Sequence, residues 1–261
     1  MKTGLVLSGG GARGFAQIGV LRVLKKNNIK IDAIAGCSVG ALIGACYAYD
    51  QDPEHIEKLM LKIQSSKDVY DYSFSTKSII KGNKLQQYIT EYFEEGKDVK
   101  FKDLKMPLSI NATDIVNGEE VVFDKGALVP SVMASLSYPG FFTMRKIEDK
   151  ICVDGGVINP LPLDLLEGMD YLILVDVSEE DKDITEESNI KDLVIQSTLI
   201  MQKKLVENRI KECKTKYIII KPDLNKVPIL AFKQSPKLIE VGEKEAEKRI
   251  EKIKKEISEL R

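Results

Sequence analysis

One short stretch of this sequence has the residue types and spacing of a nucleophilic site. Residues 36–40 are Gly-Cys-Ser-Val-Gly, and they follow an apolar segment at 31–35 that is predicted to form a strand. A Gly-x-Ser-x-Gly motif between a strand and a helix is typical of a nucleophile elbow, which exposes the serine hydroxyl at the end of a sheet. Small residues such as Gly36 and Gly40 let the backbone turn sharply without clashes. The spacing makes Ser38 the candidate nucleophile.

A serine nucleophile needs a base to take its proton, and histidine is the usual base. The single histidine of the chain, His55, falls at the start of a separate predicted helix. A carboxylate is therefore the better candidate. Asp154 follows a short apolar run and precedes two glycines, so it could stand partly desolvated beside the serine. The alternative for Asp154 is an ordinary turn, in which the carboxylate binds local amides.

A second glycine motif, Gly-Gly-Gly-Ala-Arg-Gly at residues 9–14, follows an apolar run and opens a predicted helix. Unpaired amides in such a loop and at a helix N-terminus suit negative charge. Three interpretations are open for it: an oxyanion hole, the pyrophosphate loop of a dinucleotide-binding fold, and a purely structural turn. The dinucleotide interpretation is disfavoured because the next strand leads to Ser38, where an acid would be needed to bind the ribose.

Four motifs in a fixed order together resemble the patatin-like phospholipase family. They are the glycine loop at 9–14, the Gly-x-Ser-x-Gly motif at 36–40, Ala-Ser-Leu-Ser-Tyr-Pro-Gly-Phe-Phe at 134–142, and Asp-Gly-Gly at 154–156. The resemblance covers nearly the whole chain and is closest to the short, single-domain bacterial members. Cys37 stands where threonine is common in the family, and we expect it to lie outside the chemistry.

This resemblance implies a serine acyl hydrolase with a Ser-Asp dyad, cleaving fatty-acyl esters of phospholipids, lysophospholipids or related lipids without a metal or cofactor. It makes Ser38 the nucleophile and Asp154 the base. The remaining site residues it implies are Gly9, Gly10, Gly11, Arg13 and Gly14 of the oxyanion hole, Gly36 and Gly40 of the elbow, and Gly155 and Gly156 of the Asp-Gly-Gly motif. Arg13 could either steer a lipid phosphate or brace the loop. A non-catalytic lipid-binding or regulatory protein with the same fold is the alternative function.

Alternating strands and helices predict one α/β domain over residues 1–261, with three α/β/α layers and a largely parallel central sheet. Strands are expected at 4–8, 31–35, 107–114, 119–123, 151–153, 171–176 and 217–220, and helices near 15–26, 39–49, 53–64, 83–93, 129–135, 190–211 and 236–260. Ligands bind at the carboxyl ends of strands in such sheets, and the glycine loop, Ser38 and Asp154 all fall there.

Composition and charge fit a cytoplasmic enzyme. The 261 residues carry a formal net charge of -1, which gives no reason to expect nucleic-acid binding. The four cysteines lack the spacing of a zinc site, and we expect them to be reduced. The N-terminus has no signal-peptide pattern, and no apolar stretch approaches the ~18 residues of a membrane span. The expected partner is a lipid or fatty-acyl ester, with transient contact with a membrane surface left open.

Two segments have more than one interpretation. Residues 68–82 contain Tyr70, Tyr72 and Phe74, which could form a lid over an acyl pocket or cover the core beneath a long loop. The tail at 237–261 has an apolar stripe at helical spacing. We expect this tail to pack on its own domain, in preference to a coiled coil or a membrane-surface helix.

Overall fold

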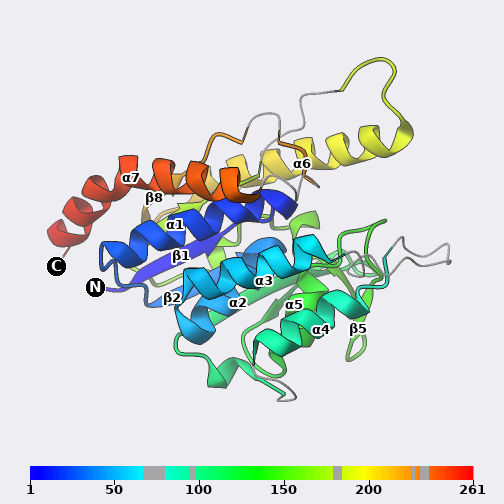
Figure 1. Ribbon diagram of the computed structural model, residues 1–261, viewed down its shortest axis with the longest axis horizontal. Coiled ribbons are helices and arrows are strands. Elements are labelled where there is room, and N and C mark those ends of the chain that lie inside the picture. The colour runs from blue at the N-terminus through cyan, green and yellow to red at the C-terminus, as the bar shows by residue number, and fades with distance from the viewer. Residues whose placement is uncertain (67–79, 94–97, 179–183, 225–226, 230–234, 261) are drawn as a thin grey trace.

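The computed structural model describes residues 1–66, 80–93, 98–178, 184–224, 227–229 and 235–260, and in this part of the chain eight strands form one sheet (Figure 1). The strands are β1 (Thr3–Leu7), β2 (Ala33–Cys37), β3 (Leu108–Asp114), β4 (Glu119–Phe123), β5 (Arg145–Ile147), β6 (Lys150–Asp154), β7 (Tyr171–Val175) and β8 (Lys216–Ile220). The helices are α1 (Phe15–Lys26), α2 (Val39–Asp50), α3 (Pro53–Ser65), α4 (Asn83–Tyr92), α5 (Leu128–Ser135), α6 (Ile190–Glu212) and α7 (Ser235–Glu259).

The sheet has the strand order β5-β6-β3-β2-β1-β7-β8, with β4 paired to β3 outside this path. The five strands from β3 to β8 are parallel, and β4, β5 and β6 pair in antiparallel fashion. The prediction of a largely parallel sheet is therefore confirmed. The strand β5 was not expected from the sequence, because it is only three residues long and none of them is buried.

The register of β3 explains why two distant motifs meet. β2 pairs with β3 up to Cys37 opposite Asn111, and β6 takes over at the next position, with Asp154 opposite Ala112. β4 occupies the other edge of β3 from Ile110 to Asp114. β2 and β6 therefore pair with the same edge of β3, and the pairing with β6 begins where that with β2 ends. The chain turns out of β2 at Ser38. The end of β2 and the end of β6 are therefore brought to the same point along β3.

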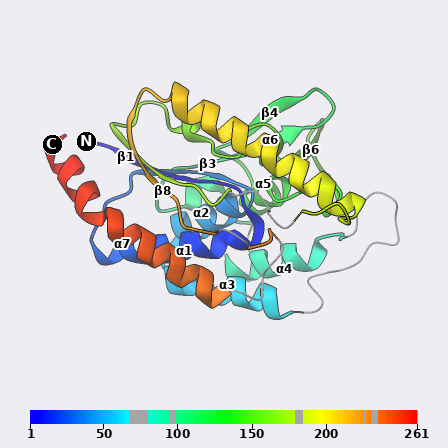
Figure 2. The ribbon, with the colours of Figure 1, turned by 90° about the horizontal axis from the view of Figure 1, so that it is seen from above.

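Helices cover both faces of the sheet, which gives the predicted three layers. Figure 2 shows α6 on one side of the sheet and α1, α3, α4 and α7 on the other. Alternate residues of β1 enter the two cores: Leu5 and Leu7 pack with α1 and α2, whereas Val6 packs against Val206 of α6. Because both faces of the central strands are buried, β1, β2 and β7 are apolar along almost their whole length.

The C-terminal helix α7 packs against α1, as expected, and buries the apolar stripe seen in the sequence. The helix expected near 53–64 is also confirmed as α3, and it begins after Asp52, whose carboxylate accepts the Glu54 amide. Tyr70, Tyr72 and Phe74 lie outside the described residues, so the lid prediction stays open. None of the helices in the described ranges is long and apolar enough to cross a membrane.

Candidate active site

Ser38 occupies a sharp, strained turn between β2 and α2. Its backbone has φ 54° and ψ -123°, a conformation that costs a non-glycine residue free energy and is held only where the surroundings enforce it. Gly40 is required next to the turn, since a Cβ there would stand 2.3 Å from the Leu7 carbonyl oxygen of β1. A Cβ at Gly36 would stand 2.5 Å from the Gly40 carbonyl oxygen. The strain and the close packing are those of a nucleophile elbow.

The Ser38 hydroxyl donates a hydrogen bond of 2.6 Å to Oδ2 of Asp154. Asp154 is only 1 % exposed, and this burial raises the pKa of its carboxyl group to about 6. Hydrogen bonds from Ser38, Gly156 and Cys37 lower the pKa, but by less than burial raises it. Desolvation disfavours the charged carboxylate, which makes it a stronger proton acceptor than a solvated aspartate. The geometry is that of a nucleophile with its base directly beside it.

The second oxygen of Asp154 is fixed by its own turn. The Gly156 amide donates to Oδ1 at 2.7 Å, in the short 3-10 turn Gly155–Val157. Cys37 Sγ lies 3.9 Å from the same oxygen, and burial raises the pKa of this thiol well above its ordinary value. The strand therefore places Cys37 against the candidate base, a contact that was not predicted, and whether Cys37 lies outside the chemistry stays a prediction. Cys37 meets Asp154 as a neutral thiol.

The glycine loop contributes amides to the site, but its residues differ in what they can do. The Gly9 amide already donates to the Pro160 carbonyl oxygen at 2.9 Å, so Gly9 fixes the loop and is not free to bind an oxyanion. The amides of Gly10 and Gly11 bind no backbone acceptor among the described residues. Gly11 has φ +56°, and a Cβ there would stand 2.4 Å from the Ile229 carbonyl oxygen.

Arg13 and Gly14 support the loop from behind. Arg13 is fully buried, and its Nε donates to the Val227 carbonyl oxygen at 2.7 Å. Of the two roles left open for Arg13, this contact favours bracing of the loop. A Cβ at Gly14 would stand 2.4 Å from Val39, so Gly14 lets the loop approach α2 closely. Neither residue lines the cavity described below.

Two amides at the candidate nucleophile, those of Ser38 and Val39, complete the elbow. The Ser38 amide donates to Ser135 Oγ at 2.8 Å, which ties the elbow to the end of α5. The Val39 amide lies in the first turn of α2, where amides have no acceptor within the helix. Val39 therefore joins Gly10 and Gly11 as a candidate donor to an oxyanion. The helix dipole of α2 favours negative charge at the same place.

Ser38 and Asp154 open into a cavity of about 350 Å³, a volume within the usual range for small-molecule sites. The glycines Gly9, Gly10, Gly11 and Gly156 also line it. The apolar wall of the cavity consists of Val39, Leu42, Met60, Ile63, Ile80, Leu85, Leu136, Phe141, Phe142 and Ile229. Such a wall suits a hydrocarbon chain, whose transfer from water is favourable by about 0.8 kcal/mol per methylene.

Sequence reasoning missed the polar residues that hold the Asp-Gly-Gly turn. Gln202 of α6 lines the cavity, and its Nε2 donates to the Gly156 carbonyl oxygen at 3.0 Å. On the other side, Asn111 of β3 donates to the carbonyl oxygens of Asn159 and Gly155, at 2.9 Å and 3.4 Å. No motif marks Gln202 or Asn111, because each reaches the turn only through the packing of a distant element. Ser135 did have a signal, since it lies in the third motif.

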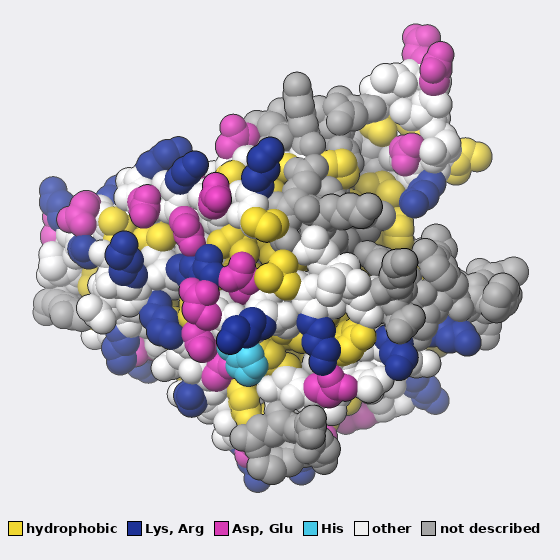
Figure 3. All heavy atoms as spheres, in the orientation of Figure 1, with side chains coloured by type: hydrophobic (Ala, Val, Ile, Leu, Met, Phe, Trp, Pro, Cys, Tyr) yellow, Lys and Arg dark blue, Asp and Glu magenta, His cyan; other side chains and the backbone are white. Residues whose placement is uncertain are grey.

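His55 lies apart from this site. Its Nδ1 is 2.7 Å from Asp50 Oδ2, and its ring stacks on Tyr92 with a centroid distance of 4.2 Å. Figure 3 shows the histidine on the outer surface, and His55 is not among the residues that line the cavity. The structure therefore brings together Ser38, Asp154 and the glycine loop, and leaves the histidine outside.

The sequence profile described as "Patatin-like phospholipase" matches residues 5–167, which include Ser38, Asp154 and the glycine loop. The chain belongs to the patatin-like phospholipase family. A match to "Patatin-like phospholipase domain-containing protein 7" of Rattus norvegicus is 33% identical over 195 residues, covering 72% of this chain and 14% of the rat protein. An uncharacterised NTE family protein of Mycobacterium tuberculosis is 30% identical over 179 residues, covering 68% of this chain and 49% of that protein.

Solved structures support the same fold. VipD from Legionella pneumophila superposes with a TM-score of 0.58 at 15% identity, covering 96% of this chain and 67% of that one. A chain of the ExoU–SpcU complex from Pseudomonas aeruginosa superposes with a TM-score of 0.52 at 17% identity, covering 96% and 51%. At these identities the likeness concerns the fold. The chain spans about half the length of its mycobacterial relative and a much smaller share of the rat one.

Proposed function

We propose that the protein is a serine acyl hydrolase that cleaves fatty-acyl ester bonds of lipids, with Ser38 as nucleophile and Asp154 as base. The observation that carries this proposal is the 2.6 Å hydrogen bond from the Ser38 hydroxyl to a buried carboxylate, at the wall of an apolar cavity. Membership of the patatin-like phospholipase family supports a lipid ester as the substrate. So does a match to "Neuropathy target esterase sws" of Drosophila melanogaster, 30% identical over 192 residues.

The first half of the reaction would form an acyl-enzyme. Ser38 Oγ attacks the carbonyl carbon of the ester while its proton passes to Asp154, and the carbonyl oxygen becomes an oxyanion. The amides of Gly10, Gly11 and Val39 are positioned to donate to it. When the intermediate collapses, the bond from carbon to the alcohol oxygen breaks, and the leaving alkoxide takes the proton from Asp154. The alcohol or lysolipid departs and the acyl group stays on Ser38.

The second half would use water in the same way. Asp154 takes a proton from water, whose oxygen attacks the acyl carbon, and the oxyanion again binds the loop amides. The bond to Ser38 Oγ then breaks, and the proton on Asp154 returns to the serine. The products are a free fatty acid and the regenerated enzyme. No step requires a metal, and the described residues contain no group of three or more histidine, cysteine or acidic side chains arranged to hold one.

A fluorophosphonate with intact-mass readout tests the proposal directly. We expect one adduct per chain on the wild-type protein and none on Ser38→Ala, which should also lose more than ~10³-fold of its activity on a short soluble ester. The control is Ser135→Ala, which keeps the Ser38 hydroxyl and should still be labelled, although more slowly because the Ser38 amide loses its acceptor. A non-catalytic lipid-binding protein would bind fatty acid yet form no adduct. That result, or Ser38→Ala turnover within tenfold of wild type, would contradict the proposal.

A further inference from the structure

The helix α6 is apolar on two opposite sides along its first half. On its inner side Ile195 and Leu199 are buried, and further along the helix Val206 packs against residues of the sheet. Its outer side carries large apolar side chains that are exposed to solvent: Ile190, Leu193, Val194, Ile200 and Met201. A contiguous row of exposed large apolar side chains is rare on a protein surface and marks a site of interaction, so the outer face of α6 calls for a partner.

The exposed residues form one stripe. Ile190 is 81 % exposed, Val194 60 % and Met201 59 %, and their spacings of four and seven residues place them along one face of the helix. Figure 3 shows hydrophobic side chains at the end of the molecule where α6 projects in Figure 1. No charged residue lies between these positions on that face, and single exposed apolar residues would not make such a row.

The two hydroxyl side chains within and beside the stripe are hydrogen-bonded to carbonyl oxygens of their own helix. Ser197 Oγ donates to the Leu193 carbonyl oxygen at 2.7 Å, and Thr198 Oγ1 donates to the Val194 carbonyl oxygen at 3.0 Å. A hydroxyl that is already hydrogen-bonded to its own helix costs less to remove from water. The outer face of α6 is therefore suited to an apolar environment even at its serine.

The same helix forms part of the wall of the candidate active site. Gln202 lines the cavity from the inner side of α6, and Lys191 lines it from the start of the helix. The Lys191 ammonium stands 5.2 Å from the centre of the Phe141 ring, which also lines the cavity. The exposed row and the cavity wall therefore share one helix, in which Lys191 and Gln202 of the wall directly follow Ile190 and Met201 of the row.

We propose that the outer face of α6, defined by Ile190, Leu193, Val194, Ile200 and Met201, docks on a lipid surface. The proposal rests on the proposed function, since a lipid acyl ester must leave such a surface to reach Ser38. Continuity between the stripe and the cavity favours a lipid surface over a second copy of the chain. At the start of the helix Lys191 and Asp192 have opposite charges, so binding should depend on apolar insertion and little on salt.

The test compares two triple variants of the full chain. Ile190→Ser/Val194→Ser/Met201→Ser removes the three most exposed side chains of the stripe. Ile115→Ser/Val116→Ser/Val122→Ser removes three exposed apolar side chains from the β3–β4 hairpin, where Val116 is 68 % exposed. Binding to phosphatidylcholine vesicles is measured by sedimentation, with Ser38→Ala added to each protein so that no lipid is consumed. This binding does not depend on the chemistry of Ser38, so failure of docking and failure of the proposed reaction are distinguishable.

We expect the α6 variant to lose at least tenfold in vesicle affinity and the hairpin variant to stay within twofold of its parent. With Ser38 restored, the α6 variant should hydrolyse vesicle lipid at least tenfold more slowly, while kcat/KM on a short soluble ester is unchanged. Equal vesicle binding by the α6 variant and its parent would overturn the proposal, as would an equal loss in both variants. A parent that is dimeric by light scattering, with a monomeric α6 variant that still binds vesicles, would assign the stripe to a second copy.

Discussion

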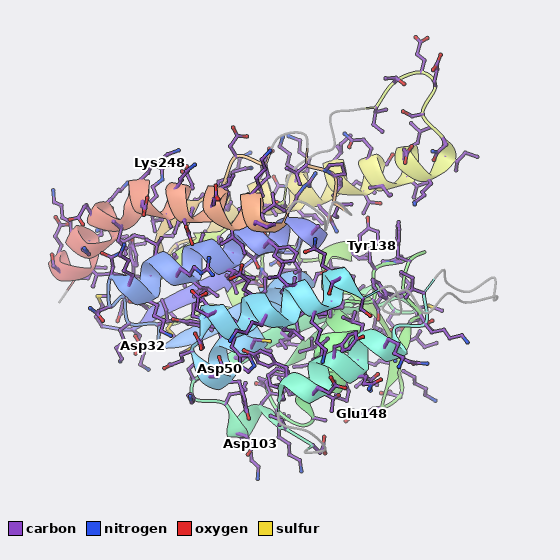
Figure 4. The ribbon with its side chains drawn as sticks, viewed as in Figure 1. Asp32, Asp50, Asp103, Tyr138, Glu148 and Lys248 are labelled. Atoms are coloured by element: carbon purple, nitrogen blue, oxygen red, sulfur yellow. The ribbon has the colours of Figure 1, made fainter. Side chains whose placement is uncertain are left out.

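Two carboxylates in this protein are hydrogen-bonded to side chains that could take part in catalysis. Asp154 accepts from Ser38 Oγ at 2.6 Å, and Asp50 Oδ2 lies 2.7 Å from Nδ1 of His55. By distance alone the two pairs are equivalent. They lie in different parts of the molecule: Figure 4 shows Asp50 well apart from Tyr138, which lines the cavity with Ser38.

The difference lies in what surrounds each pair. Asp154 is buried, its pKa is raised to about 6, and its serine partner stands on a strained turn beside amides without backbone acceptors. Asp50 is the last residue of α2, and its carboxylate also accepts from the Tyr92 hydroxyl at 2.7 Å and from the Asp52 amide at 2.8 Å. These contacts join the end of α2 to the start of α3 and to α4. A short hydrogen bond between reactive groups therefore indicates a site only where strain, burial and a cavity accompany it.

The largest expected effect comes from Asp154→Asn. The amide keeps the shape of the side chain but cannot accept the serine proton, so kcat should fall by at least ~10³-fold. Asp50→Asn is the matched control, because it makes the same change in the other pair, and it should keep at least half of the activity. The measurement is kcat and KM on a soluble ester. Comparable losses in the two variants would remove the distinction between the pairs.

The same substitution should not unfold the protein. Burial raises the pKa of Asp154 from 3.8 to about 6, so the charged carboxylate destabilises the folded state above pH 6, by about 3 kcal/mol from this group alone. Asp154→Asn removes that charge and should melt at the same temperature as wild type or higher at pH 8. A much lower melting temperature at pH 8 would mean that loss of activity reports loss of fold.

The second prediction concerns pH. The proposed base, Asp154, can accept a proton only when deprotonated, and its pKa is raised to about 6, so kcat/KM should be constant above pH 7 and fall about tenfold per unit below pH 6. The pH profile of a soluble ester, with a stability curve over the same range, checks this. An acid limb with its midpoint near pH 4 would show that the base is a solvated carboxylate and not Asp154 as the structure places it.

Much of this comparison could be predicted from the sequence, because the motifs are local. The elbow, the glycine loop and the Asp-Gly-Gly turn each encode their own backbone geometry. Each also follows a predicted strand, which places all three at the carboxyl ends of the strands. The contact between Cys37 and Asp154 could not be predicted in this way, since it depends on the register at which β6 replaces β2 along β3. Gln202 was missed for the same reason, because it approaches from a helix that the motifs do not include.

The third prediction tests the contact between α5 and the elbow. Ser135→Ala removes the acceptor of the Ser38 amide and leaves a part-buried donor unpaired, which costs about 1–3 kcal/mol. We expect kcat to fall about tenfold with KM little changed, because the contact orients the nucleophile and does not bind the acyl chain. Ser135→Thr keeps the hydroxyl and should restore most of kcat. If Ser135→Ala raises KM at constant kcat, the residue acts on substrate binding instead.

The smallest expected effect is that of His55→Ala. The ring is stacked on Tyr92 and paired with Asp50 at the surface, so its removal should lower stability by about 1 kcal/mol and leave kcat within twofold of wild type. The acid limb of the pH profile should also stay in place. Its midpoint alone does not identify the base, because an ordinary histidine titrates near ~6.5, close to a buried aspartate. The pair of variants does: a folded His55→Ala without activity, beside an active Asp154→Asn, would transfer the role of base from the buried pair to the exposed one.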